Sequence, residues 1–222
     1  MPVTMRQLIA FDLDGTLIDS RLDLAHSANI LLHHLGARPL SVDQVGDMVG
    51  EGARVLVSRV LTAAGVDTDL NAALARFLEI YDAHLADHTG LYPGVVEALS
   101  TLEGHAALAL LTNKPLHHTE RLLDILGVRH FFFEVIGGDG PWPRKPAPAG
   151  LEHLISAAGA SPQTTIMVGD SMVDVETATR ASARMCVASY GFGRVDVDLP
   201  TGSLVVDDAR DLKARLLEAI TT

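Results

Sequence analysis

Six short apolar runs, each about as long as one buried strand, are distributed along this chain of 222 residues. They occupy residues 8–11, 106–111, 132–136, 165–168, 185–188 and 204–206. Segments with apolar residues at helical spacing accompany the later runs, at 116–126, 149–158, 173–181 and 208–220. Because strands that alternate with helices form parallel sheets with helices on both faces, the pattern predicts an α/β fold with a doubly wound, mainly parallel sheet.

One interval interrupts this alternation, since about seventy residues without a convincing strand separate the first run from the helix expected after Pro93. Apolar residues recur at helical spacing within 24–35, 53–64 and 70–85. We therefore expect an all-helical subdomain that is inserted into the sheet domain. The expected division assigns residues 1–18 and 90–222 to an α/β core and residues 19–89 to the helical subdomain.

The formal net charge of −11 excludes whole classes of partner. Nucleic acids and anionic membrane surfaces attract basic patches, so we expect neither as a partner. The single Cys186 cannot form an intrachain disulfide, and its apolar surroundings predict a buried core residue. No apolar run approaches the roughly 20 residues that span a bilayer, and the first run is too short for a signal peptide. A soluble, cytoplasmic protein is expected, and the choice between monomer and homodimer is left open.

The first apolar run ends in Asp12 and Asp14, which Gly15 and Thr16 follow. Buried charges are costly unless they are paired or bound to a metal, and ligands of open parallel sheets bind at this edge. The two acids therefore indicate a cation or a shared proton. Gly15 permits a sharp turn that brings backbone N–H groups to an anion, and the Thr16 hydroxyl is a further donor. Taken alone, a segment of this kind more often forms a solvated Asp-Gly turn.

Two further polar segments follow apolar runs. Thr112 and Asn113 precede the expected helix 116–126, where a helix N-terminus favours an anion, although either residue can simply cap that helix. Lys145 lies between prolines in the loop 140–148, and the stiff backbone reduces the entropy lost in positioning its ammonium group. The alternative for Lys145 is an ordinary solvated lysine.

A fourth segment places Asp170 and Asp174 after the run 165–168. Their spacing of four puts them on one side of the turn that starts the next helix. Such hard oxygen ligands suit Mg²⁺. Helix capping by Asp170 or Ser171 is the simpler alternative, and it is compatible with metal binding.

In this order, the segments around Asp12, Thr112, Lys145 and Asp170 resemble the four signature motifs of the haloacid dehalogenase superfamily of phosphohydrolases, over essentially the whole chain. The resemblance implies a Rossmann-like core, with the helical insert as the small cap of that superfamily. Within the superfamily, five segments of this chain resemble the phosphoglycolate phosphatases, although related phosphatases and sugar phosphate mutases share much of these segments. These segments are 91–95, 111–115, 137–139, 145–146 and 190–193.

The resemblance also implies catalytic roles. Asp12 corresponds to the nucleophile, which takes the phosphoryl group as an aspartyl-phosphate intermediate and so divides one difficult displacement into two easier ones. Asp14 corresponds to the general acid that protonates the leaving alcohol and then to the base that activates water. Thr112 and Lys145 correspond to the residues that hold the transferring phosphoryl oxygens, the kind of electrostatic positioning on which phosphoryl transfer depends.

The remaining site residues are implied in the same way. The Mg²⁺ ligands would be Asp12, the main-chain carbonyl of Asp14, Asp170 and Asp174, the last either directly or through water. Substrate and phosphate contacts would come from Gly15, Thr16, Asn113 and the cap loop Gly50, Glu51 and Gly52. This loop resembles the glycine-containing cap loop of phosphoglycolate phosphatases, and its two glycines permit close backbone approach to a small carboxylate, while a plain turn between helices is the alternative.

The predicted function is Mg²⁺-dependent hydrolysis of a small phosphorylated metabolite, with 2-phosphoglycolate as the first candidate. Two rival functions remain open at this point: a phosphomutase acting on a sugar phosphate, and a noncatalytic binding protein on the same fold. His117 and His118 are interpreted as helix-surface residues near the second motif.

Overall fold

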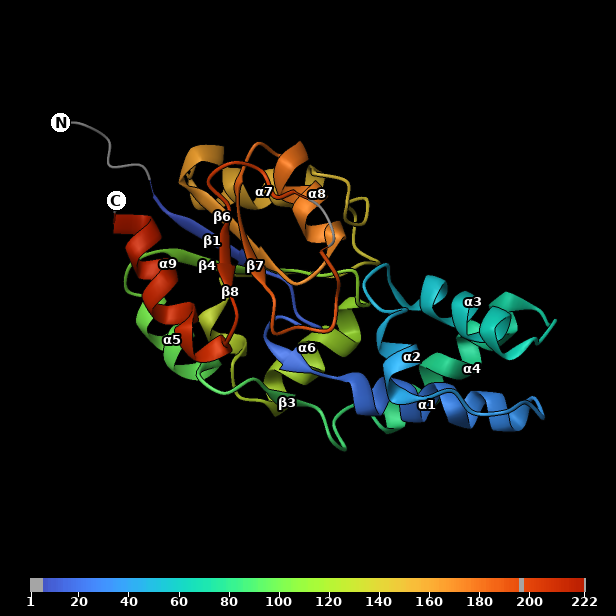
Figure 1. Cartoon of the computed structure of the whole chain (residues 1–222). Coiled ribbons are helices and arrows are strands. Elements are labelled where there is room, and N and C mark those ends of the chain that lie inside the picture. The colour runs from blue at the N-terminus through green and yellow to red at the C-terminus, as the bar shows by residue number, and fades with distance from the viewer. Residues whose placement is uncertain (1–5, 196–197, 222) are drawn as a thin grey trace.

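The computed structural model describes residues 6–195 and 198–221, and its centre is a six-stranded sheet (Figure 1). Every neighbouring pair of strands in this sheet is parallel. The predicted α/β class with a mainly parallel sheet is thus confirmed. In spatial order the strands are β5 (Glu134–Ile136), β4 (Ala107–Leu111), β1 (Leu8–Phe11), β6 (Thr165–Gly169), β7 (Arg184–Ala188) and β8 (Leu204–Val206).

Helices cover both faces of the sheet, which explains why central strands are apolar throughout. Along β1, Leu8 and Ala10 face one hydrophobic cluster, whereas Ile9 and Phe11 face the other. The first cluster contains residues of α7 (Ala149–Ala158) and α8 (Met172–Arg180), and the second contains residues of α5 (Val95–Leu102), α6 (Leu116–Ile125) and α9 (Leu212–Thr221). Among the described residues, no helix is both long enough and apolar enough to cross a membrane.

Two predicted elements of the core start two or more residues later in the structure. The strand expected at 132–136 begins at Glu134, because a 3-10 turn (Arg129–Phe131) precedes it and Phe133 is 47% exposed. The helix expected at 208–220 begins as a 3-10 turn (Ala209–Asp211) before α9. The Asp208 side chain accepts a hydrogen bond from the Arg210 N–H at 2.9 Å and stabilises this tighter turn. A further 3-10 turn (Pro162–Thr164) leads into β6.

A helical insert separates β2 (Ile18–Asp19) from β3 (Gly90–Leu91). These two short strands pair antiparallel, so the chain leaves and re-enters the core side by side. That residues 19–89 form a separate domain stays a prediction. The insert contains α1 (Arg21–His34), α2 (Val42–Gly46), α3 (Ala53–Ala64) and α4 (Leu70–Ala83).

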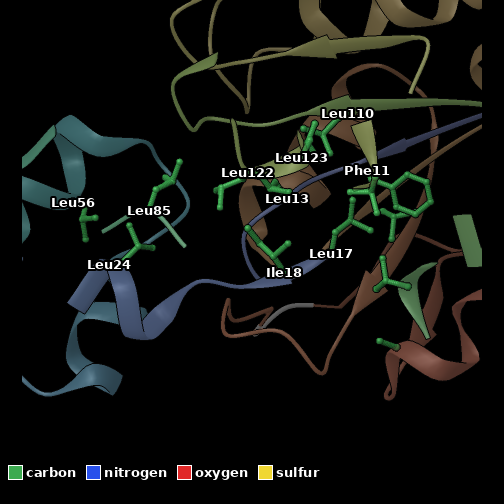
Figure 2. Close-up of a cluster of buried hydrophobic side chains, with 14 of the residues drawn as sticks. Phe11, Leu13, Leu17, Ile18, Leu24, Leu56, Leu85, Leu110, Leu122 and Leu123 are labelled. Atoms are coloured by element: carbon green, nitrogen blue, oxygen red, sulfur yellow. The ribbon is translucent and has the colours of Figure 1, made fainter. Parts of the chain in front are cut away.

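The insert and the core share one hydrophobic cluster. Figure 2 shows Leu24 and Leu56 of the insert in the same cluster as Leu122 of α6 and Leu17 of the core. Since apolar burial stabilises packing roughly in proportion to area, this shared cluster holds the insert against the core.

A buried carboxylate also fixes the base of the insert. Asp23 of α1 is 1% exposed and accepts hydrogen bonds from the N–H groups of His88 and Thr89 and from the Thr89 hydroxyl. These bonds join the first helix of the insert to the segment that returns to the core. We conclude that packing and polar contacts together set where the insert lies over the carboxyl edge of the sheet.

Candidate active site

The carboxyl ends of three neighbouring strands bring the predicted residues together. Asp12 follows β1, Thr112 follows β4 and Asp170 follows β6, and these strands are adjacent in the sheet. Lys145 reaches the same edge from the loop between β5 and α7. Ligands of open α/β sheets bind at this edge. The parallel topology therefore converts four distant sequence segments into one site.

Lys145 lies between two carboxylates at the centre of the site. Its Nζ is 2.8 Å from Asp12 Oδ1 and 2.6 Å from Asp174 Oδ1. All three residues are buried. Burial by itself lowers the pKa of Lys145, but the charges of Asp12 and Asp174 outweigh it and hold that pKa above its ordinary value. Lys145 is therefore a fixed positive charge beside Asp12.

Three carboxylates form an acidic cluster around this lysine. Asp12, Asp170 and Asp174 each offer an oxygen within 4.8 Å of the other two. Burial raises the pKa of Asp12 to about 6, and burial with the charges of Asp174 and Asp12 raises the pKa of Asp170 well above its ordinary value. One ammonium group does not balance three carboxylates. The uncompensated charge and the hard oxygen donors fit a divalent cation such as Mg²⁺.

The raised pKa of Asp12 predicts that the metal-free protein loses stability as the pH rises. In the folded state the pKa is raised from 3.8 to about 6. The folded protein then binds more protons than the unfolded chain within this range, so the free energy of unfolding should fall as pH increases through it. The raised pKa of Asp170 likewise makes the free energy of unfolding fall as the pH rises. Burial lowers the pKa of His118, so this residue makes the free energy of unfolding increase with pH in the range below the ordinary pKa of histidine.

Urea unfolding in the presence of a chelator, from about pH 4 to about pH 7, measures this dependence. The variant Asp12→Asn should show a smaller fall with pH than the wild type, because it lacks the titrating carboxyl group. Equal slopes in the two proteins would contradict the assignment of the raised pKa to Asp12.

Neighbouring groups fix the orientation of the other two acids. Asp170 Oδ2 accepts hydrogen bonds from the N–H groups of Phe192 at 3.1 Å and Gly193 at 2.7 Å. Asp174 Oδ2 accepts from the Ser171 N–H at 3.2 Å and the Ser171 hydroxyl at 2.7 Å, while its Oδ1 contacts Lys145. Ser171 is also the N-cap residue of α8. The capping interpretation and the site interpretation of this segment are therefore compatible.

Asp14 is held by a residue that the sequence did not single out. Lys114 Nζ lies 2.9 Å from both carboxylate oxygens of Asp14, and the Ser20 hydroxyl donates to Oδ1. Burial alone lowers the pKa of Lys114, but Asp14 and the neighbouring Tyr81 hydroxyl raise it overall. The available signal was the position of Lys114 directly after Thr112 and Asn113. A lysine at a strand end is usually solvated, so that signal was weak.

Asn113 connects the core to the insert instead of capping a helix. Its Nδ2 donates to the carbonyl of Gly50 at 3.0 Å and to that of Lys145 at 2.9 Å. The N-cap residue of α6 is Pro115, and its side chain makes no capping hydrogen bond. The Leu116 N–H instead donates to Asp139 Oδ1 at 2.7 Å. The capping explanation for Thr112 and Asn113 is thus wrong.

A pocket lies between this edge of the sheet and the insert. Asp12, Asp14 and Thr112 line it from the core, and Gly50 and Gly52 line it from the loop between α2 and α3. At Gly52, φ is +90° and an added Cβ would lie 3.0 Å from the Asn113 carbonyl oxygen, so the close approach of loop and core favours glycine.

Glu51, which was expected to contact substrate with these two glycines, is oriented differently. It forms an ion pair with Arg59 of α3 and is not among the residues lining the pocket. The structure therefore places Gly50 and Gly52 in the pocket wall and Glu51 outside it, because an arginine of the neighbouring helix holds the carboxylate.

The turn at Gly15 and Thr16 also differs in part from expectation. Gly15 has φ of +84°, and an added Cβ would lie 1.9 Å from Asp170 Oδ2, so glycine is required for the sharp turn. However, the Gly15 N–H donates to the Ile18 carbonyl and the Thr16 N–H to that of Leu13. Neither N–H is free in this turn, which does not support their expected use as phosphate donors. The Thr16 hydroxyl is buried with no partner among the described residues.

His118 corrects the interpretation of the histidine pair as surface residues. The side chain of His117 is 70% exposed, but that of His118 is only 8% exposed. The ring of His118 packs against Tyr81 of α4, with ring centroids 5.5 Å apart. The packing of α6 against the insert buries this ring, and helical spacing alone does not reveal such a contact.

The site consists of buried acids and a lysine at the carboxyl edge of a parallel sheet, and the helical insert covers it. This arrangement is typical of α/β enzymes. The model of the haloacid dehalogenase-like hydrolase family matches residues 7–182. The chain belongs to this family of hydrolases. The resemblance inferred from the four motifs is thereby confirmed.

Several similar proteins have names that are more specific than the description of the family. A phosphoglycolate phosphatase of Pseudomonas putida is 42% identical over 95% of this chain and 80% of its own length. The phosphoglycolate phosphatase of Caulobacter vibrioides is 36% identical over 96% of this chain and 92% of its own length. The crystal structure of a predicted phosphoglycolate phosphatase from Haemophilus somnus superposes with a TM-score of 0.88 at 31% identity, covering 96% of this chain and 99% of that one.

Proposed function

We propose that this hydrolase cleaves a small phosphate monoester in a Mg²⁺-dependent reaction, with 2-phosphoglycolate as the first candidate substrate. The protein is a phosphoric monoester hydrolase, as its family and its relatives indicate. The observation that carries it is the contact of Asp12 with Lys145 at 2.8 Å inside the acidic cluster. The naming of similar proteins as phosphoglycolate phosphatases supports the choice of substrate.

Asp12 acts as the nucleophile in this mechanism. One carboxylate oxygen attacks the phosphorus, the ester bond to the leaving alcohol breaks, and an aspartyl phosphate forms. Lys145 and Thr112 hold the phosphoryl oxygens, and Lys145 offsets the repulsion between the carboxylate and the phosphate. Lys145 is fixed by Asp174, so little reorganisation is needed when the substrate binds.

Asp14 transfers protons in both halves of the reaction. It donates a proton to the oxygen of the leaving alcohol, and the resulting carboxylate then removes a proton from the water that attacks the phosphorus of the phosphoaspartate. The bond between phosphorus and the Asp12 oxygen breaks, which releases inorganic phosphate and restores the Asp12 carboxylate. Ser20 and Lys114 hold this carboxyl group from the side. Their contacts restrict its rotation, which favours proton transfer in a fixed direction.

Asp12, Asp170, Asp174 and the main-chain carbonyl of Asp14 would hold the Mg²⁺ ion. When bound, the ion neutralises charge on the phosphate and on the surrounding carboxylates. The three carboxylates fit this role because they are buried and close together, and Lys145 pairs with only two of them among the described residues. The hydrogen bonds from Phe192 and Gly193 keep Asp170 oriented toward the cluster.

The helical insert acts as a cap that excludes water from the site and contributes to substrate selection. The bond from Asn113 to the Gly50 carbonyl joins the cap loop to the edge of the sheet. This contact brings the loop into the wall of the pocket that contains Asp12 and Asp14. A short substrate is favoured, since a long one would have to displace this contact.

A panel of phosphate esters tests the proposed function. Wild-type protein should release phosphate from a chromogenic ester and from 2-phosphoglycolate with Mg²⁺ and lose this activity in a chelator. The value of kcat/KM should be higher for 2-phosphoglycolate than for glucose 1-phosphate or glucose 6-phosphate. Isomerisation of a sugar phosphate without phosphate release would identify a mutase instead, and absence of turnover of every ester would reject the hydrolase proposal.

A further inference from the structure

The pocket above Asp14 contains polar groups that the catalytic steps do not use. Leu24, Leu56 and Phe77 of the insert supply an apolar roof. Lys114 of the core and Tyr81 of α4 line the same pocket. A short leaving group that enters beside Asp14 therefore meets apolar side chains together with an ammonium group and a phenol.

The two buried lysines of the site contact different carboxylates. Lys145 lies between Asp12 and Asp174, on the side where the phosphoryl group is transferred. Lys114 contacts Asp14, the proposed donor to the leaving alcohol. Among the described residues that line the pocket, Lys114 is the only cation. A negative charge on the leaving alcohol would find its favourable partner there.

The Tyr81 hydroxyl lies beside the Lys114 ammonium without a well-formed hydrogen bond to any described residue. It is buried, and the charge of Lys114 is close enough to influence its pKa. The Lys114 ammonium lies 4.8 Å from the centre of the Tyr81 ring. A buried hydroxyl without a partner is unfavourable, which indicates a ligand that completes its hydrogen bonding.

From these contacts we infer that Lys114 and Tyr81 form a subsite for a carboxylate on the leaving alcohol of the substrate. This inference rests on the proposed phosphatase function and names the residues that select the substrate. The ammonium pairs with the carboxylate while it also holds Asp14, and the phenol donates a second hydrogen bond. Because Tyr81 belongs to the insert and Lys114 to the core, the subsite is complete only when the two are in contact.

Two esters of similar length test the subsite. The first is 2-phosphoglycolate, and the second is 2-hydroxyethyl phosphate, in which a neutral hydroxymethyl group replaces the carboxylate. Lys114→Met should lower the wild-type preference for the first ester, as a ratio of kcat/KM values, by about 10- to 100-fold. Tyr81→Phe keeps the ring stacked on Phe77 and should lower this ratio by about 3- to 10-fold, mainly through KM.

Tyr92→Phe is the matched control. The Tyr92 hydroxyl is also buried without a partner among the described residues, but it does not line this pocket. The ratio for this variant should equal that of the wild type. An equal fall for both esters in Lys114→Met would mean that Lys114 only positions Asp14, and it would overturn the subsite. If Lys114→Met does not fold, Tyr81→Phe with its control decides the question.

A binding measurement separates failure of the subsite from failure of the proposed function. Hydrolysis of both esters without a preference for the carboxylate would overturn the subsite and leave the phosphatase proposal in place. If neither ester is hydrolysed, calorimetric titration of the Mg²⁺-supplied protein with glycolate remains decisive. Binding that Tyr81→Phe or Lys114→Met weakens by about 3-fold or more supports the subsite, and absence of binding overturns it.

Discussion

Replacement of Asp12 by asparagine is expected to lower kcat for phosphate release by at least about a thousandfold, because an amide cannot form the phosphoaspartate. Asparagine has nearly the same shape, so the side chain still fits its buried position beside Lys145. Steady-state phosphate release measures the loss. Acid quenching with phosphate-labelled substrate should recover label on the wild-type protein and none on the variant.

Asp124→Asn is the control for this prediction. Asp124 is exposed on α6 and lines a different hollow of the surface, so the same chemical change should leave kcat near the wild-type value. Thermal unfolding of both variants shows whether a loss of activity follows from a loss of structure. Turnover by folded Asp12→Asn at the wild-type rate would remove Asp12 from its proposed role.

Replacement of Lys145 by methionine should affect stability as well as activity. The change leaves Asp12 and Asp174 without the ammonium that lies 2.8 and 2.6 Å from them. Breaking a buried ion pair by removing one partner typically costs about 3–5 kcal/mol. We expect a loss of this size in the metal-free protein, together with a decrease in kcat of about 100- to 1,000-fold from the lost phosphate contact.

Mg²⁺ should restore part of the stability of Lys145→Met, since it binds the folded acidic cluster and not the unfolded chain. Urea unfolding with Mg²⁺ and with a chelator measures both effects. Lys213→Met is the comparison, because Lys213 pairs with Glu97 at the surface, where such pairs contribute little. A Lys145→Met protein as stable as the wild type without metal would contradict the proposed electrostatic balance.

The sequence alone predicted the sheet and most of the acidic site, because both depend on patterns within short segments of the chain. Asp12, Thr112 and Asp170 each follow an apolar run, and parallel strands carry their carboxyl ends to one edge. The position of each residue relative to its own strand is therefore enough to bring the group together. Lys145 required one further clue, the stiff proline-containing loop that carries it. Their proposed catalytic roles remain to be tested by the variants above.

Side-chain contacts between residues far apart in the sequence, or between neighbouring elements of the insert, were beyond this kind of inference. The sequence predicts no role for Lys114, because its pairing with Asp14 spans 100 positions in the sequence. The burial of His118 depends on which helix faces meet, whereas Glu51 pairs with Arg59 of the helix that directly follows its loop. Local spacing does not specify those faces.

The amino-acid sequence by itself thus determined the α/β class, the helical insert and the polar residues at the ends of the central strands, because each depends on short-range patterns. Only the tertiary structure decided the surroundings of Asp14 and the composition of the pocket above it. The surroundings of Asp14 depend on its long-range contact with Lys114, and the pocket depends on the apolar cluster that α4 and α6 share. Such long-range packing, and not a motif, brings Tyr81 next to Lys114.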